Sequence, residues 1–143
     1  MKTVYLVSCV KGKQTSAAAA KDLYTSDWFR KVRAYIEPTG MPWFILSAEY
    51  GFLHPDQRTD HYEKTLNKMR SWERKQWAEK VIHQMEQELP KAEQIVVFAG
   101  EKYREHLMSY LRRTATSIEV PLEGLKIGQQ LRWFKEQAGH GSA

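Results

Sequence analysis

The sequence predicts an α/β fold: a single three-layer domain with about four parallel strands and helices on both faces. Two patterns lead to this prediction. Short apolar runs occur without the alternation of a half-exposed strand, and segments with helical periodicity separate them. Strands buried on both faces and joined by helices form a parallel sheet. The chain has 143 residues, 42% of them hydrophobic, which suits one domain with its own core.

The first half of the chain supplies two strands and one helix. The β-branched and aromatic run at residues 3–8 predicts the first strand, and a polar loop follows it. From Asp27, apolar residues that include Trp28 recur at helical spacing, and Pro38 ends this helix. The uninterrupted apolar run at residues 43–47 predicts the second strand.

The second half repeats the alternation of helix and strand. Its predicted elements are a helix at residues 67–88, a strand at 94–99, a helical stripe through Tyr103, Leu107, Tyr110 and Leu111, a strand at 117–120, and a helix through Ile127, Leu131 and Phe134. Residues 1–138 form the domain, and the small and polar residues 139–143 predict a disordered tail.

Charge and composition restrict the class of protein. The formal net charge is +5, which is compatible with an acidic partner such as nucleic acid and equally with a solvated basic surface. No apolar run is long enough to cross a membrane, and the first residues do not form a signal peptide. The single cysteine, Cys9, excludes an internal disulfide. We expect a cytoplasmic protein, and the composition leaves its oligomeric state open.

The predicted topology brings four loops to one edge of the sheet. Right-handed crossovers place the segments 8–22, 48–66, 99–103 and 121–128 at the carboxyl ends of the strands, where ligands bind in open α/β folds. The segment from Glu49 to Leu66 is much longer than the roughly four to six residues that usually join elements in a compact domain. We expect it to form a wall of a pocket.

Two of these loops carry candidate binding residues. In the first loop, Ser8, Lys11 and Lys13 are candidates for holding a phosphate, with Gly12 giving access to the backbone. The alternative is that the lysines only solvate a loop. In the second loop, Tyr50 is positioned to stack on a base.

Candidate catalytic carboxylates lie in the second loop. Asp56 and Asp60 are candidates for the general base, or for stabilising an oxocarbenium-like transition state at a glycosidic bond. The alternative is solubility or capping, since Asp60 stands three residues before Glu63. His54 and His61 lack a third ligand, so we predict no metal. The absence of a Walker motif and of G-x-G-x-x-G argues against nucleotide cofactors, and we predict none.

Several of these residues together resemble known families. Ser8-x-x-Lys11, followed by Ser47-x-x-Tyr50-Gly51-x-Leu53-x-Pro55 and then Tyr62, resembles the pattern of the YaaA peroxide-stress family. Nearly the whole chain resembles a smaller bacterial and phage domain of unknown function. The residues that carry this second resemblance are Val7-Ser8-Cys9, Lys11, Lys13, Leu23-Tyr24-Thr25-Ser26 before Phe29, Ser47-Ala48, Gly100 and Tyr103.

The resemblance implies an α/β domain akin to uracil-DNA glycosylase-like folds. Its relatives are tied to DNA binding, oxidative stress, modified-base metabolism and, in phage defence, glycosylases of modified DNA. Ser8-Cys9-Val10-Lys11 stands where uracil glycosylases carry an aspartate-containing motif, so uracil excision is not predicted. The expected substrate-binding residues are Ser8, Cys9, Lys13, Ser47, Tyr50, Gly51, Tyr62, Gly100 and Tyr103.

The leading hypothesis is an enzyme that hydrolyses the N-glycosidic bond of a modified base in nucleic acid, with DNA favoured, or of a nucleoside. Asp56 or Asp60 would act at the anomeric carbon. A variant of the hypothesis makes Lys11 a Schiff-base nucleophile. Two alternatives remain open: a non-catalytic DNA-binding stress protein of YaaA type, and a domain that binds a free nucleotide.

Overall fold

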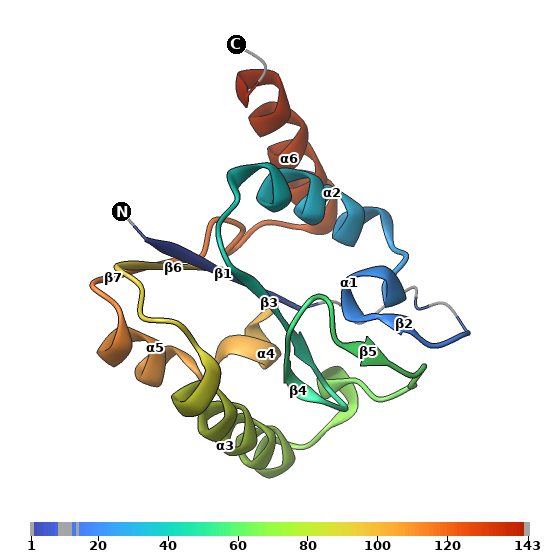
Figure 1. The fold of residues 1–143 in the computed structure, drawn as a ribbon, viewed down its shortest axis with the longest axis vertical. Helices are drawn as coiled ribbons and strands as arrows, with labels where there is room; N and C mark the ends of the chain where they lie inside the picture. Colours follow the sequence, from blue (N-terminus) through green and yellow to red (C-terminus); the bar gives the residue numbers. More distant parts are fainter. Residues whose placement is uncertain (1, 9–12, 14, 142–143) are drawn as a thin grey trace.

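A five-stranded sheet forms the centre of the molecule (Figure 1). The computed structural model describes residues 2–8, 13 and 15–141. The strands follow the spatial order β4-β3-β1-β6-β7. Their bounds are Thr3–Ser8 for β1, Trp43–Ser47 for β3, Gly51–Leu53 for β4, Gln94–Phe98 for β6 and Ser117–Glu119 for β7. All neighbours pair in parallel except β4, which is antiparallel to β3.

The structure confirms the predicted α/β class and its parallel strands. β1 and β3 have the predicted bounds, and β6 and β7 each end one residue earlier than predicted. In the centre of the sheet, Val4, Leu6 and Val7 are fully buried, as are Ile45 and Leu46. Burial on both faces explains why these strands have continuous apolar runs.

The edge strand β4 was not predicted, because the sequence analysis placed its residues in a loop. Gly51 has a φ of 78°, which lets the chain reverse directly after β3, and Leu46 then pairs with Phe52. Three residues are too few to show a strand pattern. A second small sheet in the same region pairs β2 (Ala18–Ala19) with β5 (Arg58–Thr59) in antiparallel orientation.

The first long helix follows the predicted pattern. α2 spans Asp27–Ile36, and the Ser26 hydroxyl caps it by accepting a hydrogen bond from the Phe29 N–H at 3.1 Å. The short helix α1 (Ala20–Leu23) precedes it, and the 3-10 turn η1 (Glu37–Thr39), which contains Pro38, ends it.

The predicted start of the second long helix was four residues too early. α3 spans Ser71–Glu88, and the Arg70 N–H donates to the Glu73 carboxylate at 3.0 Å, which fixes the first turn. The preceding residues form a separate 3-10 turn, η2 (Leu66–Lys68), because the Thr65 hydroxyl accepts from the Asn67 N–H. The helical stripe through Tyr103 and Leu111 is split into α4 (Glu101–Arg104) and α5 (Met108–Thr114).

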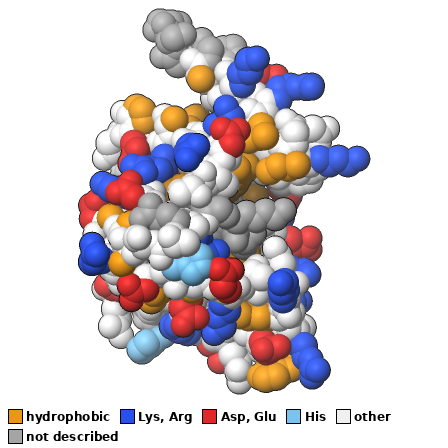
Figure 2. Space-filling model, turned by 90° about the vertical axis from the view of Figure 1, so that its right-hand side faces the viewer, with side chains coloured by type: hydrophobic (Ala, Val, Ile, Leu, Met, Phe, Trp, Pro, Cys, Tyr) orange, Lys and Arg blue, Asp and Glu red, His pale blue; other side chains and the backbone are white. Residues whose placement is uncertain are grey.

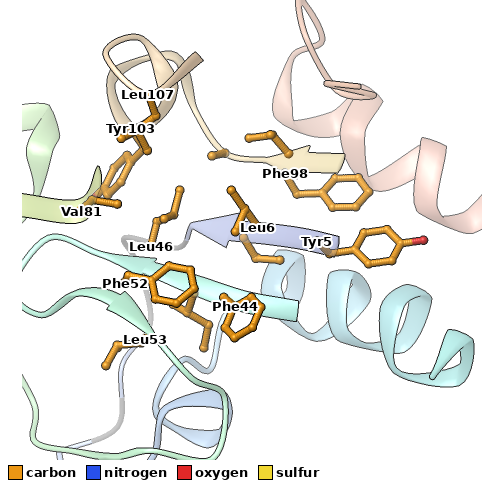
Figure 3. Packing of buried hydrophobic residues seen from close by; sticks show 14 of the residues in the cluster. Tyr5, Leu6, Phe44, Leu46, Phe52, Leu53, Val81, Phe98, Tyr103 and Leu107 are labelled. Atoms are coloured by element: carbon orange, nitrogen blue, oxygen red, sulfur yellow. The ribbon is translucent and has the colours of Figure 1, made fainter. Parts of the chain in front are cut away.

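Two helical layers cover the sheet (Figure 1). α2 and α6 (Ile127–Gly141) pack on one face, where the stacked rings of Tyr5 and Phe98 meet Tyr35 and Phe134. α3, α4 and α5 lie on the other face, where the Trp77 ring contacts Tyr103. Figure 3 shows buried side chains of the sheet, such as Leu6 and Phe98, beside Val81 of α3 and Tyr103 of α4. α6 extends three residues beyond residue 138, where the sequence analysis ends the domain.

None of the helices in the described ranges combines the length and the apolar character needed to cross a membrane.

Candidate functional site

The strand order creates a switch point beside β1. The chain passes from β1 to β3 on one side, and later returns to β6 on the other side of β1. In open α/β sheets, such a reversal leaves a crevice at the carboxyl ends of the two central strands, and ligands bind there. Ser8 ends β1, and Gly100 follows β6. The predicted ligand edge therefore has its centre between these two residues.

A cleft of about 480 Å³ lies at this switch point, within the usual size of a small-molecule site. It is bounded by the ends of β1 and β6, the start of α2, the turn η2 and the first turns of α6. The lining residues are Ser8, Ser26, Asp27, Trp28, Asn67, Gly100, Tyr103, Ile127, Gln130 and Leu131. Figure 2 views the molecule from this edge and shows exposed hydrophobic side chains around a hollow in the upper half of the face. We call this space the switch-point cleft.

Ser8 gives the cleft a polar group. The residue is only 6% exposed, and within the described part of the chain its hydroxyl has no hydrogen-bond partner. The hydroxyl is not among the buried side-chain atoms that lack a partner, so it keeps access to the cleft. A serine hydroxyl without a protein partner that reaches a cleft is available to a ligand.

Gly100 and Tyr103 lie beside Ser8 in the cleft. Gly100 precedes the first turn of α4, and open space would surround a Cβ at this position, so its backbone is accessible. Tyr103 is 3% exposed, and its hydroxyl accepts from the Leu66 N–H at 3.4 Å. The structure thus brings together three of the predicted binding residues, from positions far apart in the sequence.

The opposite wall of the cleft is apolar. Trp28 is held by its indole N–H, which donates to the Gln130 side chain at 2.8 Å, and by an edge contact with Phe134. Leu131 lines the same wall, as does Ile127, which is 61% exposed. An apolar wall with a polar group across from it suits a flat ligand such as a base.

Tyr50 and Tyr62, which were both predicted to bind substrate, lie together in a packed cluster. The Tyr62 hydroxyl is 2.6 Å from that of Tyr24, the Tyr50 ring contacts Tyr62 edge-on, and the Lys13 ammonium lies 4.6 Å from the Tyr62 ring centre. The Tyr50 hydroxyl bonds to the backbone of Asp60, accepting from its N–H at 3.2 Å. We call Tyr24, Tyr50 and Tyr62 the tyrosine cluster. None of its described members is among the residues that line the cleft.

Ser47 and Gly51 shape the turn between β3 and β4. Ser47 is fully buried, and its hydroxyl accepts from the Glu49 and Tyr50 N–H groups at 3.2 and 3.0 Å. A Cβ on Gly51 would lie 2.3 Å from the Gln84 side-chain oxygen. Gln84 in turn accepts from the Phe52 N–H and donates to the Tyr50 carbonyl. Ser47 and Gly51, which were both predicted to bind substrate, therefore stabilise the turn between β3 and β4 in this structure.

The two candidate carboxylates lie away from the cleft lining. Asp56 has an 83% exposed side chain and pairs with Lys21 at 2.7 Å. Hydrogen bonding and charge attraction from Lys21 lower the Asp56 pKa below its usual value. Asp60 is exposed on the loop after β5. Their catalytic roles stay predictions, as do the catalytic role of Lys11 and the binding role of Cys9, which both lie outside the described residues.

The sequence analysis missed four parts of the cleft wall: Asp27, Trp28, Asn67 and the first turn of α6. Asp27 and Trp28 were read only as the start and the apolar stripe of a helix. The position of these residues could have identified them as part of the site, because helices that follow parallel strands begin at the same edge of the sheet as the loops.

In the part of the chain that the structure describes, the histidines show no grouping that would hold a metal. His54 lies beside Glu88, and His61 beside Glu63. Among the residues that the structure describes, no three potential ligands gather.

A family model covers most of the chain. The model of DUF6884, a family of unknown function, matches residues 4–136. The chain belongs to this family. The match spans all five strands and the residues of the switch-point cleft, and the description of DUF6884 assigns no activity. No curated protein and no solved structure matches the chain. The resemblance to the YaaA family therefore stays a prediction.

Proposed function

We propose that this DUF6884 domain is a nucleoside- or nucleotide-processing enzyme that binds its ligand in the switch-point cleft. The observation that carries the proposal is the unpartnered Ser8 hydroxyl in a cleft at the topological switch point. A hydroxyl that the fold leaves unpaired and that reaches a cleft can bond to a ligand.

The two walls of the cleft suit the two parts of a nucleotide. The base packs against Trp28 and Leu131, whose side chains supply a flat and an apolar surface. A sugar hydroxyl or phosphate oxygen bonds to Ser8 and approaches the open backbone at Gly100.

The reaction that we propose is hydrolysis of an N-glycosidic bond, most concretely that of a modified base in DNA. The net charge of +5 supports a nucleic-acid partner. A cleft of about 480 Å³ holds one nucleoside, so a base in a duplex would have to rotate out of the stack to enter it.

Measuring nucleoside binding tests the proposed site, and detecting free base after incubation with DNA tests the proposed reaction. Isothermal titration calorimetry with a panel of nucleosides and nucleotides should find a ligand whose affinity falls about tenfold in Ser8→Ala, the usual worth of a lost hydrogen bond. The matched control is Ser109→Ala, an exposed serine on α5, which should bind as wild type. Mass spectrometry of modified-base DNA after incubation should show free base.

Two outcomes would contradict the proposal. If no member of the panel binds, or if Ser8→Ala binds like Ser109→Ala, the cleft is not the site. If ligands bind in the cleft but no base is released from any substrate, the domain binds nucleotides without the proposed chemistry.

A further inference from the structure

We infer that Asp27 is the carboxylate that stabilises the positive charge on the sugar during cleavage of the N-glycosidic bond. The inference rests on the proposed function and adds a catalytic residue to it. Among the described residues that line the switch-point cleft, Asp27 has the sole carboxylate. A glycosidic bond breaks through an oxocarbenium-like transition state, which needs a negative charge beside the sugar.

Asp27 is free to act on a ligand. It is exposed, and it makes no hydrogen bond or ion pair with any residue that the structure describes. Asp56, in contrast, is neutralised by Lys21 at 2.7 Å and does not line the cleft. Of these two acids, Asp27 is the one that lines the cleft and whose negative charge is not paired with any described residue.

The fold holds Asp27 in place. It is the first residue of α2, and the preceding Ser26 caps that helix. The next residue, Trp28, is fixed by its hydrogen bond to Gln130 and forms part of the apolar wall. A base lying against Trp28 would therefore have its sugar within reach of the neighbouring carboxylate, with Ser8 in the same cleft to hold the sugar or phosphate.

The proposed step is balanced with water as the second reactant. The C1′–N bond breaks, and its electron pair stays on the base nitrogen. The positive charge shared by C1′ and the ring oxygen lies beside the Asp27 carboxylate. The oxygen of a water then bonds to C1′, and one of its protons passes to Asp27 and on to solvent. The base takes up one proton from solvent, which gives free sugar and free base.

An acid at the start of a helix also stabilises that helix through its dipole, so loss of activity alone would not distinguish the two roles. The test therefore uses binding of two uncleavable analogues. Both carry the base preferred in the nucleoside panel, joined to the sugar by a carbon–carbon bond. They differ only at the sugar ring atom, which is oxygen in the neutral analogue and a protonated nitrogen in the cationic one.

Wild type should bind the cationic analogue more tightly than the neutral one by about tenfold or more, because the cation mimics the charge of the transition state. Asp27→Asn should abolish this preference and keep the affinity for the neutral analogue. Glu79→Gln, at an exposed acid on α3, is the matched control and should keep the preference. Circular dichroism checks that each variant is folded.

The outcomes separate this inference from the proposed function. If the neutral analogue binds and Asp27→Asn keeps the preference for the cation, or wild type shows no preference, the role of Asp27 is refuted and the cleft remains the binding site. If neither analogue binds wild type, the proposed function fails and the role of Asp27 fails with it.

Discussion

Single residues in this domain are fixed by partners that lie far away in the chain. Phe52 is held by Gln84, Trp28 by Gln130, and the hydroxyl of Tyr24 by that of Tyr62. Ser8 differs from these residues, because within the described ranges its hydroxyl has no partner although the residue is buried. A group that the fold does not use for its own stability is a candidate for binding.

At Ser8, binding should change while stability does not. Ser8→Ala removes a hydroxyl that makes no hydrogen bond with described residues, so the free energy of unfolding should change by less than about 0.5 kcal/mol. Urea unfolding measures this change. A loss of about 2 kcal/mol or more would show that the hydroxyl stabilises the fold.

At Gly51, both the backbone conformation and the space require glycine. Gly51→Ala should lower the free energy of unfolding by about 2–4 kcal/mol, because φ is 78° and the new Cβ would displace Gln84 from its two hydrogen bonds. Gly124 has a φ of 79° with nothing within 4 Å of a Cβ, so Gly124→Ala isolates the backbone cost of about 1–2 kcal/mol. Equal losses in the two variants would exclude a role for Gln84.

At the scale of elements, the long segment from Glu49 to Leu66 is more ordered than a loop. It contains β4 and β5, and β5 pairs with β2. The backbone of α1 joins it as well, since the Lys21 N–H donates to the Pro55 carbonyl at 2.8 Å. Its aromatic residues pack into the tyrosine cluster. The predicted role of this segment as a pocket wall stays a prediction, because its described members do not line the switch-point cleft.

The ion pair between Lys21 and Asp56 should make the attachment of α1 sensitive to pH. The hydrogen bond and the positive charge of Lys21 lower the Asp56 pKa below the usual value of an aspartate. The pair therefore stabilises the fold fully above that usual value, and this stability is lost as pH falls through the lower pKa of the folded state. The stability difference between wild type and Asp56→Asn should therefore be present at neutral pH and vanish in acid. Both groups are exposed, so added salt should also reduce the difference. Thermal unfolding across this pH range measures it, and a difference that grows in acid would contradict the assignment.

At the scale of the whole molecule, α6 links the core to the cleft. Its residues Trp133 and Phe134 pack on Phe98 of the central sheet, and its first turn supplies Ile127 and Leu131 to the cleft. The stability of the domain and the shape of the cleft therefore depend on different residues of one helix.

Two substitutions in α6 should separate these effects. Phe134 is 4% exposed and contacts three rings from two other elements, α2 and β6, so Phe134→Ala should cost about 3–5 kcal/mol of unfolding free energy. Ile127 is 61% exposed, so Ile127→Ala should change stability by less than about 0.5 kcal/mol and weaken nucleoside binding. Urea unfolding and calorimetry measure the two effects. Unchanged binding in Ile127→Ala would remove the apolar wall from the proposed site.

The sequence by itself determined the class of the fold and the alternation of its strands and helices. Continuous apolar runs gave the bounds of β1 and β3, because a strand buried on both faces needs apolar residues at every position. Helical periodicity and Pro38 located α2 in the same way. The alternation of strands and helices also predicted the edge of the sheet at which we propose that the ligand binds.

Only the tertiary structure decided which side chains meet at that edge. Ser8, Asp27, Gly100 and Ile127 come from four segments that the crossovers bring to one cleft. The edge strand β4 likewise depends on Gln84, more than thirty residues further along the chain. Local sequence patterns record the burial of each element, whereas a site depends on contacts between elements, and no local pattern records those.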